Sequence, residues 1–427
     1  MHPRARQARG LRRQGRQPPR HRASRHVRRP QGAGFAGVSE PHDDLSNMMS
    51  SSGPQMTNGE RARQHYERAA ELQEQGKLAE ALNEAELAVS LAPEDPNVVY
   101  LVGSVFYDLE RYDEALAVGQ RLVRIDPEQS YVHHNLGLTL KALKRYSEAA
   151  EQFQEAIRLD PDDADCHNQL ADVLDELGQP EEALAECREA IRLEPNDADH
   201  HLLLAYILGE LERYDEAVEE YRESIHLHDG HVARHNLAND LMRLGRLEES
   251  ASEYREAIRL EPDSADTYYD LSSALRELGC NEERLTACAD AVRLDPTNYD
   301  YRYALAWAYE DLERYGESAS EYREAARLAP DNWWPRFNLG GVLRKQERYA
   351  EAIEEYRESL KLNPDDADTH FNLGLCLSEL GRLGEAIAEY REGLRLNPGD
   401  EDARDELDAL MERFIDCDPD SETGEDE

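Results

Sequence analysis

The sequence has little lysine, few aromatic residues and no long apolar run. Lysine fills five of the 49 basic positions, and aromatic residues make up 7% of the 427 residues. No stretch approaches the run of about 18 apolar residues that a membrane helix needs, and the N-terminal region shows no apolar core of a secretory signal. We therefore expect a cytoplasmic protein without a membrane span.

Signatures of catalysis and of cofactor binding are missing as well. The sequence contains no G-x-x-x-x-G-K phosphate loop and no zinc-binding H-E-x-x-H helix. None of its six cysteines forms a C-x-x-C pair. We therefore expect no enzymatic activity, no catalytic residue and no cofactor.

One group of histidines is a candidate for metal binding. Four imidazoles within ten residues could hold zinc or nickel. The alternative is that two of them end a helix, where a cation suits the helix dipole, and that another fills a position that is aromatic elsewhere in the chain. We favour the alternative and expect no metal site. The four residues are His226, His228, His231 and His235.

The formal net charge of −42 is unevenly distributed. Residues 1–30 contain eleven arginines and no acid, so the rest of the chain is still more acidic. Nucleic acid therefore does not suit the acidic body as a partner, because phosphates need a basic face. Residues 1–60 show no hydrophobic period and are predicted to be disordered. Three readings of this segment stay open: a basic arm for nucleic acid or anionic lipid, a solvated tail, and a misassigned gene start.

Prolines recur at a period of 34 residues along most of the chain. The step breaks only where Asp229 replaces the expected proline, next to a junction that is one residue shorter. A fixed period in this range indicates an architecture of stacked repeats. The prolines are Pro93, Pro127, Pro161, Pro195, Pro262, Pro296, Pro330, Pro364 and Pro398.

The unit at 130–163 shows the remaining marks of the repeat. Its first half carries His133, Leu136, Gly137 and Leu140, and its second half carries Ala149, Phe153, Ala156 and Pro161. This spacing resembles the tetratricopeptide repeat, W-x2-L-G-x2-Y…A-x3-F…P. The resemblance covers residues 62–400 in ten copies. It implies an all-α fold, a right-handed solenoid of helix–turn–helix units.

Several positions refine this expected solenoid. Gly178, Gly245, Gly279 and Gly381 mark the turn inside a unit, where a left-handed residue can end the first helix. Residues 401–416 have helical spacing and are predicted to cap the last repeat, and 417–427 are predicted to be a disordered acidic tail.

Two repeats depart from the pattern. Arg284 stands where other repeats carry Ala or Ser, so its guanidinium must reach solvent or pair with an acid. Together with the short junction at Asp229–Gly230, it predicts a softer middle of the array. Cys187 and Cys288 replace a core aromatic residue and are predicted to be small buried hydrophobes.

The resemblance implies that the first helices line a concave groove, where solenoids bind their partners. The sixth position of the repeat is often asparagine, whose amide both donates and accepts hydrogen bonds. Repeats of O-GlcNAc transferase are similar in this respect. The fifth position is often aromatic, and aromatic residues anchor interfaces. We predict that the groove site comprises Asn135, Asn236, Asn338, Asn372, Tyr269, Tyr303, Trp307, Trp334, Phe337 and Phe371.

Alternatives to this groove site are that the asparagines bond within their own helices and that the aromatic residues only pack between repeats. The second position is mostly acidic, which argues against the basic carboxylate clamp of chaperone cofactors. We expect a scaffold or adaptor that binds a protein or an extended peptide, neutral or basic. A non-catalytic subunit or fragment of a glycosyltransferase-type repeat enzyme is the alternative. The acids are Asp165, Asp199, Asp266, Asp300 and Asp368.

Overall fold

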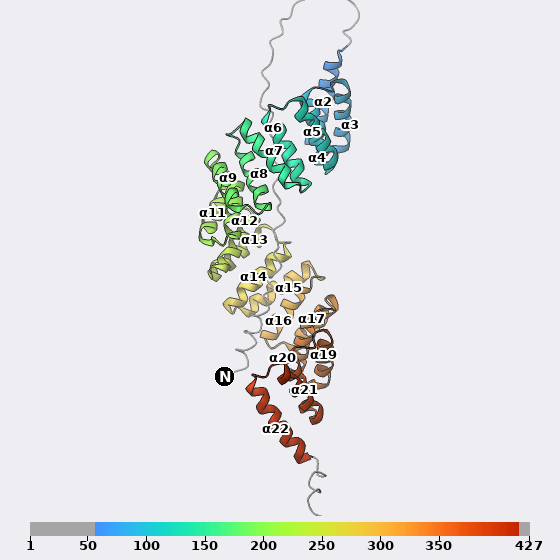
Figure 1. Cartoon of the computed structure of the whole chain (residues 1–427), viewed down its shortest axis with the longest axis vertical. Coiled ribbons are helices and arrows are strands. Elements are labelled where there is room, and N and C mark those ends of the chain that lie inside the picture. The colour runs from blue at the N-terminus through green and yellow to red at the C-terminus, as the bar shows by residue number, and fades with distance from the viewer. Residues whose placement is uncertain (1–55, 418–427) are drawn as a thin grey trace, which may run out of the picture. The chain divides into compact units, whose positions relative to one another are not determined.

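The computed structural model describes residues 56–417, and this region is all-helical (Figure 1). It contains 21 helices and no strand within these residues. The predicted basic segment up to residue 55 and the acidic tail from residue 418 lie outside the described region. None of the helices in this part of the chain is long and apolar enough to cross a membrane.

The chain divides into two compact units, Met1–Ile125 and Asp126–Glu427. The described part of the first unit holds two helix pairs, and Ala69, Leu72 and Leu101 belong to its core. Its first helix begins inside the segment predicted to be disordered, which corrects the 1–60 boundary. Thr57 and Glu60 form a reciprocal capping box that satisfies the first backbone N–H groups. The helices are α2 (Asn58–Glu74), α3 (Leu78–Leu91), α4 (Pro96–Asp108) and α5 (Tyr112–Ile125).

The second unit holds eight helix pairs followed by a single helix, and is an α-solenoid. The first helices of its pairs are α6 (Ser130–Ala142), α8 (Ala164–Glu176), α10 (Ala198–Glu210), α12 (His231–Arg243), α14 (Ala265–Leu278), α16 (Tyr299–Asp311), α18 (Trp334–Lys345) and α20 (Ala367–Glu379). The second helices are α7 (Tyr146–Leu159), α9 (Pro180–Leu193), α11 (Tyr214–Leu227), α13 (Leu247–Leu260), α15 (Asn281–Leu294), α17 (Tyr315–Leu328), α19 (Tyr349–Leu362) and α21 (Leu383–Leu396). The last helix is α22 (Glu401–Cys417).

A left-handed residue ends the first helix of every pair. At the end of α20, Gly381 has a φ of 71°. Its N–H donates to Ser378, and the N–H of Arg382 reaches back to Leu377 at 2.9 Å. These bonds satisfy carbonyls that the helix end would leave open. The four predicted glycines all adopt this conformation, and six further positions share it: Gly76, Glu110, Lys144, Glu212, Glu313 and Glu347.

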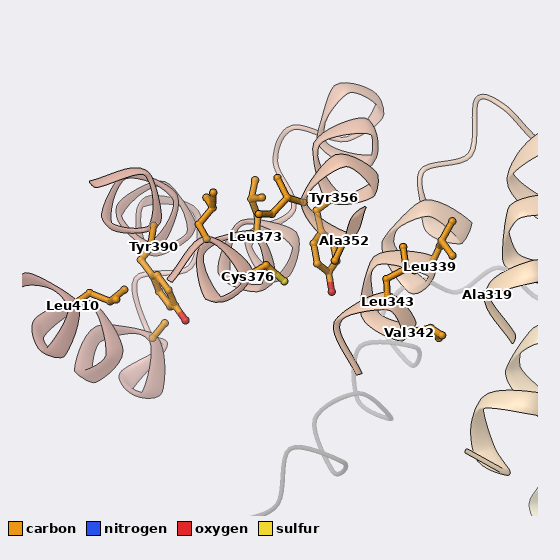
Figure 2. Close-up of a cluster of buried hydrophobic side chains, with 14 of the residues drawn as sticks. Ala319, Leu339, Val342, Leu343, Ala352, Tyr356, Leu373, Cys376, Tyr390 and Leu410 are labelled. Carbon is orange, nitrogen blue, oxygen red and sulfur yellow. The ribbon is translucent and has the colours of Figure 1, made fainter. Parts of the chain in front are cut away.

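Close approach between the two helices of a pair depends on small residues. A methyl group added at Gly340 would lie 2.7 Å from the ring of Tyr356, and one at Gly374 would lie equally close to Tyr390. Both tyrosines are core residues (Figure 2). Cys187 and Cys288 fill the corresponding space in their repeats and are 0% and 1% exposed, which confirms that they are buried.

The core runs from one repeat to the next. The cluster in Figure 2 begins at Ala306 and Ala319, passes through Leu343 and Tyr356, and ends at Leu410 of α22. Leu410 is completely buried, so α22 covers the apolar end of the last repeat. Each repeat thus buries its apolar face against its neighbours.

Arg284 pairs with an acid instead of reaching solvent. Its side chain is 2% exposed and forms an ion pair with Asp311 of α16. The guanidinium also lies 5.1 Å from the ring centroid of Trp307. The repeat therefore accommodates the larger residue by giving its charge a partner.

Candidate functional site

All ten predicted groove residues lie on first helices, and each is partly exposed. They follow the register of the repeat, since α6 and α12 carry Asn135 and Asn236, while the others lie on α14, α16, α18 and α20. Partial exposure leaves each of them available for a contact without removing it from the packing of its own repeat.

Five of these residues form one connected group, here called the aromatic cluster: Tyr303, Trp307, Trp334, Phe337 and Asn338. The Trp334 indole N–H donates to Tyr303 Oη at 2.6 Å, and Asn338 Nδ2 donates to the same oxygen at 3.3 Å. Trp334 stacks on Phe337 with ring centroids 5.3 Å apart. The Tyr303 and Trp307 rings meet edge to face at 6.4 Å. The cluster thus joins α16 to α18.

Two guanidinium groups lie over the ring of Trp307. The Arg276 guanidinium lies 4.8 Å from its ring centroid, and that of Arg284 lies 5.1 Å away. Such cation–π contacts occupy aromatic surface that a partner would otherwise use. The sequence does not reveal them, because both arginines come from the preceding repeat.

Three of the four predicted groove asparagines form a hydrogen bond within their own helix. Asn135, Asn338 and Asn372 each donate to the backbone carbonyl four residues earlier, at 2.6, 2.8 and 2.7 Å. An amide offers two N–H donors and an accepting oxygen. The backbone bond uses one donor and fixes the orientation of the side chain. In Asn338 the bond to Tyr303 uses the second donor, which leaves the oxygen. Asn236 instead hydrogen-bonds Tyr221 of the preceding repeat.

The remaining aromatic site residues pack inside the array. Phe371 lies 5.9 Å from Tyr390 of its own repeat and occupies space that a side chain at Gly393 would fill. Tyr269 lies 5.3 Å from Tyr301 of the next repeat. Both residues therefore have a structural role beside any contact with a partner.

Carboxyl groups of α12 and α14 are shifted toward neutrality. Burial, together with the nearby charge of Asp266, raises the pKa of Asp270 to about 7. Burial also raises the pKa of Asp240 to about 7. His235 Nε2 lies 3.4 Å from Asp270, and Tyr301 donates to Asp266. A cation placed beside these groups would favour their charged forms.

A polar contact between the two helices of a pair is a second periodic feature, which the sequence analysis did not predict. The fourth position of most repeats is His or Arg and contacts Glu or Gln nineteen residues later, on the second helix of the same pair. The sequence contains these residues at a fixed spacing, but its many other acidic residues make the spacing hard to recognise. The pairs are His65–Glu84, His133–Gln152, His167–Glu186, His201–Glu220, Arg234–Glu253, Arg302–Glu321, Arg336–Glu355 and His370–Glu389.

Two of the four histidines considered as metal ligands, His231 and His235, have other contacts. His231 Nε2 lies 3.0 Å from Thr267 Oγ1, and His231 Nδ1 lies 3.0 Å from Glu261 Oε2. His235 Nδ1 lies 3.2 Å from Thr267 Oγ1. Two different groups bring metal-binding atoms within 4.8 Å of one another. They are His134, Asp163 and Cys166, and Glu194, Asp197 and His200.

One open cavity of about 380 Å³ lies on α9, α10 and α11. Arg188, Leu204 and Glu220 are among its lining residues, and none of the ten predicted site residues is. The cavity is therefore separate from the aromatic cluster.

Sequence profiles of known families match much of the chain. Profiles named "Tetratricopeptide repeat" match residues 66–130, 140–207, 199–227, 299–332 and 337–401. A profile named "TPR repeat" matches residues 238–279. Together the matches span more than half of the chain. No curated protein matches it.

Several solved structures are similar to parts of the chain. YrrB, "a TPR protein with an unusual peptide-binding site", is 21% identical, covers 43% of this chain and 94% of its own, and has a TM-score of 0.39. The C-terminal part of a TPR repeat-containing protein from Cytophaga hutchinsonii is 17% identical, with coverages of 55% and 97% and a TM-score of 0.49. Pseudomonas aeruginosa pilF is 19% identical, with coverages of 47% and 92% and a TM-score of 0.42.

Proposed function

The chain belongs to the tetratricopeptide repeat family, and we propose that it is a scaffold that binds an extended peptide or a partner protein along its first helices. Stacked repeats of this kind present extended surfaces to partners. The observation that carries the proposal is the aromatic cluster. Partly exposed Trp334 and Asn338 are bonded to Tyr303 of the preceding first helix, and Phe337 stacks on Trp334.

Pre-organisation favours binding at this cluster. The Trp334 ring is fixed by its bond to Tyr303 and by stacking on Phe337. A partner that covers it therefore loses little side-chain freedom on the scaffold side. The oxygen of Asn338 and the remaining N–H and oxygen of Asn372 can pair with the backbone of an extended peptide, largely independently of its sequence.

The charge of the first helices favours a neutral or basic partner. Asp266 and Asp270 lie close enough for the charge of one to raise the pKa of the other. A lysine or arginine of a bound peptide would relieve this repulsion, whereas an acidic peptide would increase it. We propose that the protein works in the cytoplasm, as expected from its sequence.

A panel of labelled peptides tests the proposal on the full chain. Extended neutral and basic peptides should bind, and acidic peptides of equal length should not. Replacing both amides, Asn338→Ala with Asn372→Ala, should weaken binding by about tenfold, equivalent to about 1.4 kcal/mol.

The matched control replaces two partly exposed asparagines near second helices, Asn281→Ala with Asn363→Ala. These positions begin α15 and follow α19, outside the predicted groove. Binding should be unchanged in this control. Equal affinity of the first double variant and the wild type, or an equal loss in the control, would reject the groove.

A further inference from the structure

Three side chains with metal-binding atoms converge between the first helices of two successive repeats. His134 lies on α6, Asp163 caps the start of α8, and Cys166 lies in the first turn of α8. His134 Nδ1 is 3.0 Å from Cys166 Sγ, which is 3.1 Å from Asp163 Oδ2. Cys166 is completely buried, and the other two residues are partly buried.

The repeat itself does not require this combination. The position of Cys166 carries aliphatic, hydroxyl-bearing or aromatic residues in most other repeats of the second unit, among them Val132, Thr267, Tyr301 and Thr369. The Asp163 side chain accepts the Cys166 backbone N–H at 3.0 Å through Oδ1. This helix cap orients the carboxylate and leaves Oδ2 beside the sulfur.

The next repeat supplies a second observation at the equivalent place. His200 stands where Cys166 stands in its own repeat, and its side chain is 1% exposed. Its Nδ1 is buried and has no hydrogen-bond partner, while its Nε2 lies 3.9 Å from Asp165, the residue before Cys166. An unsatisfied buried ring nitrogen is costly, and the metal-binding atoms of His200, Glu194 and Asp197 lie within 4.8 Å of one another.

We propose that His134, Asp163 and Cys166 form a binding site for a divalent transition metal of the zinc type. Sulfur, nitrogen and oxygen ligands from one Cys, one His and one Asp match the preference of zinc, with water as a fourth ligand. The thiolate and the carboxylate together neutralise the charge of the ion. On binding, the metal replaces the thiol proton, which passes to solvent.

The geometry requires only a small adjustment. Tetrahedral zinc would hold the three ligand atoms roughly 3.5 Å apart. The two observed separations are 3.0 and 3.1 Å, so each would have to widen by about 0.5 Å to admit the ion.

Such an ion would link α6 to α8, and hence two successive repeats. It would hold their first helices at a fixed separation and stabilise this joint of the solenoid by mass action. The inference is independent of peptide binding, because it rests on ligand atoms and not on the aromatic cluster.

Cobalt titration of the untagged, reduced full chain tests the site. Co²⁺ should produce a near-ultraviolet thiolate charge-transfer band that saturates at one ion per chain, and Zn²⁺ should abolish the band. Cys166→Ser should eliminate the band, and His134→Asn should weaken Co²⁺ binding at least about tenfold, the loss typical of removing a contact near the metal.

Matched variants control for folding and for other sites. Cys187→Ser changes a cysteine that is equally buried, and His133→Asn changes the neighbouring histidine, which contacts Gln152 and Pro127 instead. Both variants should keep the band. Glu194, Asp197 and His200 offer no sulfur, so cobalt bound there would give no thiolate band.

X-ray absorption of the zinc-loaded wild type makes the test independent of the folding of any variant. It should show one sulfur ligand at about 2.3 Å with lighter ligands completing the shell. Absence of a sulfur ligand, absence of the cobalt band in the wild type, or a band that survives Cys166→Ser would overturn the proposal.

Discussion

The ion pair between Arg284 and Asp311 predicts an asymmetric response to mutation. Arg284 is 2% exposed, whereas the side chain of Asp311 is 36% exposed. Removing Asp311 leaves a buried guanidinium without a counter-charge, and the guanidinium is always protonated. Breaking a buried pair in this way costs about 3–5 kcal/mol. We therefore expect Asp311→Ala to destabilise this repeat strongly.

Removing the arginine should have a smaller effect. In Arg284→Met, Asp311 can hydrate at the surface and the methionine fills most of the volume. The lost contact with Trp307 accounts for about 0.5–2 kcal/mol. The difference between the two variants should thus reach about 2–3 kcal/mol.

Hydrogen exchange is the suitable assay, because an array of repeats does not unfold as one unit. Amides of α15–α17 should exchange about 30- to 100-fold faster in Asp311→Ala than in Arg284→Met, since each 1.4 kcal/mol is tenfold. Equal exchange in the two variants, or faster exchange in Arg284→Met, would refute the assigned role of the ion pair.

Three further predictions concern the repeat itself. The hydrogen bond to Glu389 raises the pKa of His370, so the protonated ring stabilises the folded protein. This stabilisation is fully present below the unfolded-state pKa of about 6.5, and it is lost as the pH rises through the higher folded-state pKa. The urea midpoint should therefore fall between about pH 6 and pH 8.5 more in the wild type than in His370→Asn; parallel curves would contradict this. Glu347→Gly keeps the left-handed turn and removes its steric cost, which is about 1–2 kcal/mol for a residue with a side chain. The greater chain entropy of glycine in the unfolded state offsets about 0.5–1 kcal/mol of this gain. Its melting temperature should rise, and a decrease would count against the turn assignment. Gly393→Ala should displace the Phe371 ring and cost about 1–3 kcal/mol in chemical denaturation, whereas an unchanged midpoint would show that the ring can move freely.

The repeat fold could be predicted because its marks recur at fixed spacing. Pro364 and Tyr356 each have counterparts one period away, and a single sequence therefore contains many copies of the same signal. Six of the ten left-handed turns were not predicted, and five of these six carry a residue other than glycine, such as Glu110 or Lys144, which does not by itself indicate that conformation. Their φ values follow from the hydrogen bonding of the helix end, which imposes the turn on whatever residue occupies it.

The candidate site was predicted less completely than the fold. Register places Asn338 and Phe371 on first helices, but it does not say what lies beside each side chain. Phe371 packs against Tyr390 because Gly393 leaves space for its ring, and Trp307 lies against two guanidinium groups. These contacts depend on residues outside the repeat pattern, so only the packed structure reveals them.

Photo-crosslinking tests the proposed binding surface most directly. Two variants each carry one photoreactive residue. It replaces Asn338 on α18 in the first variant and Glu354 on α19 in the second. The side chain of Glu354 is 71% exposed. Each chain is illuminated with a basic peptide that binds the wild type. We predict crosslinks from position 338 and none from position 354. Crosslinks from position 354 alone would contradict binding along the first helices.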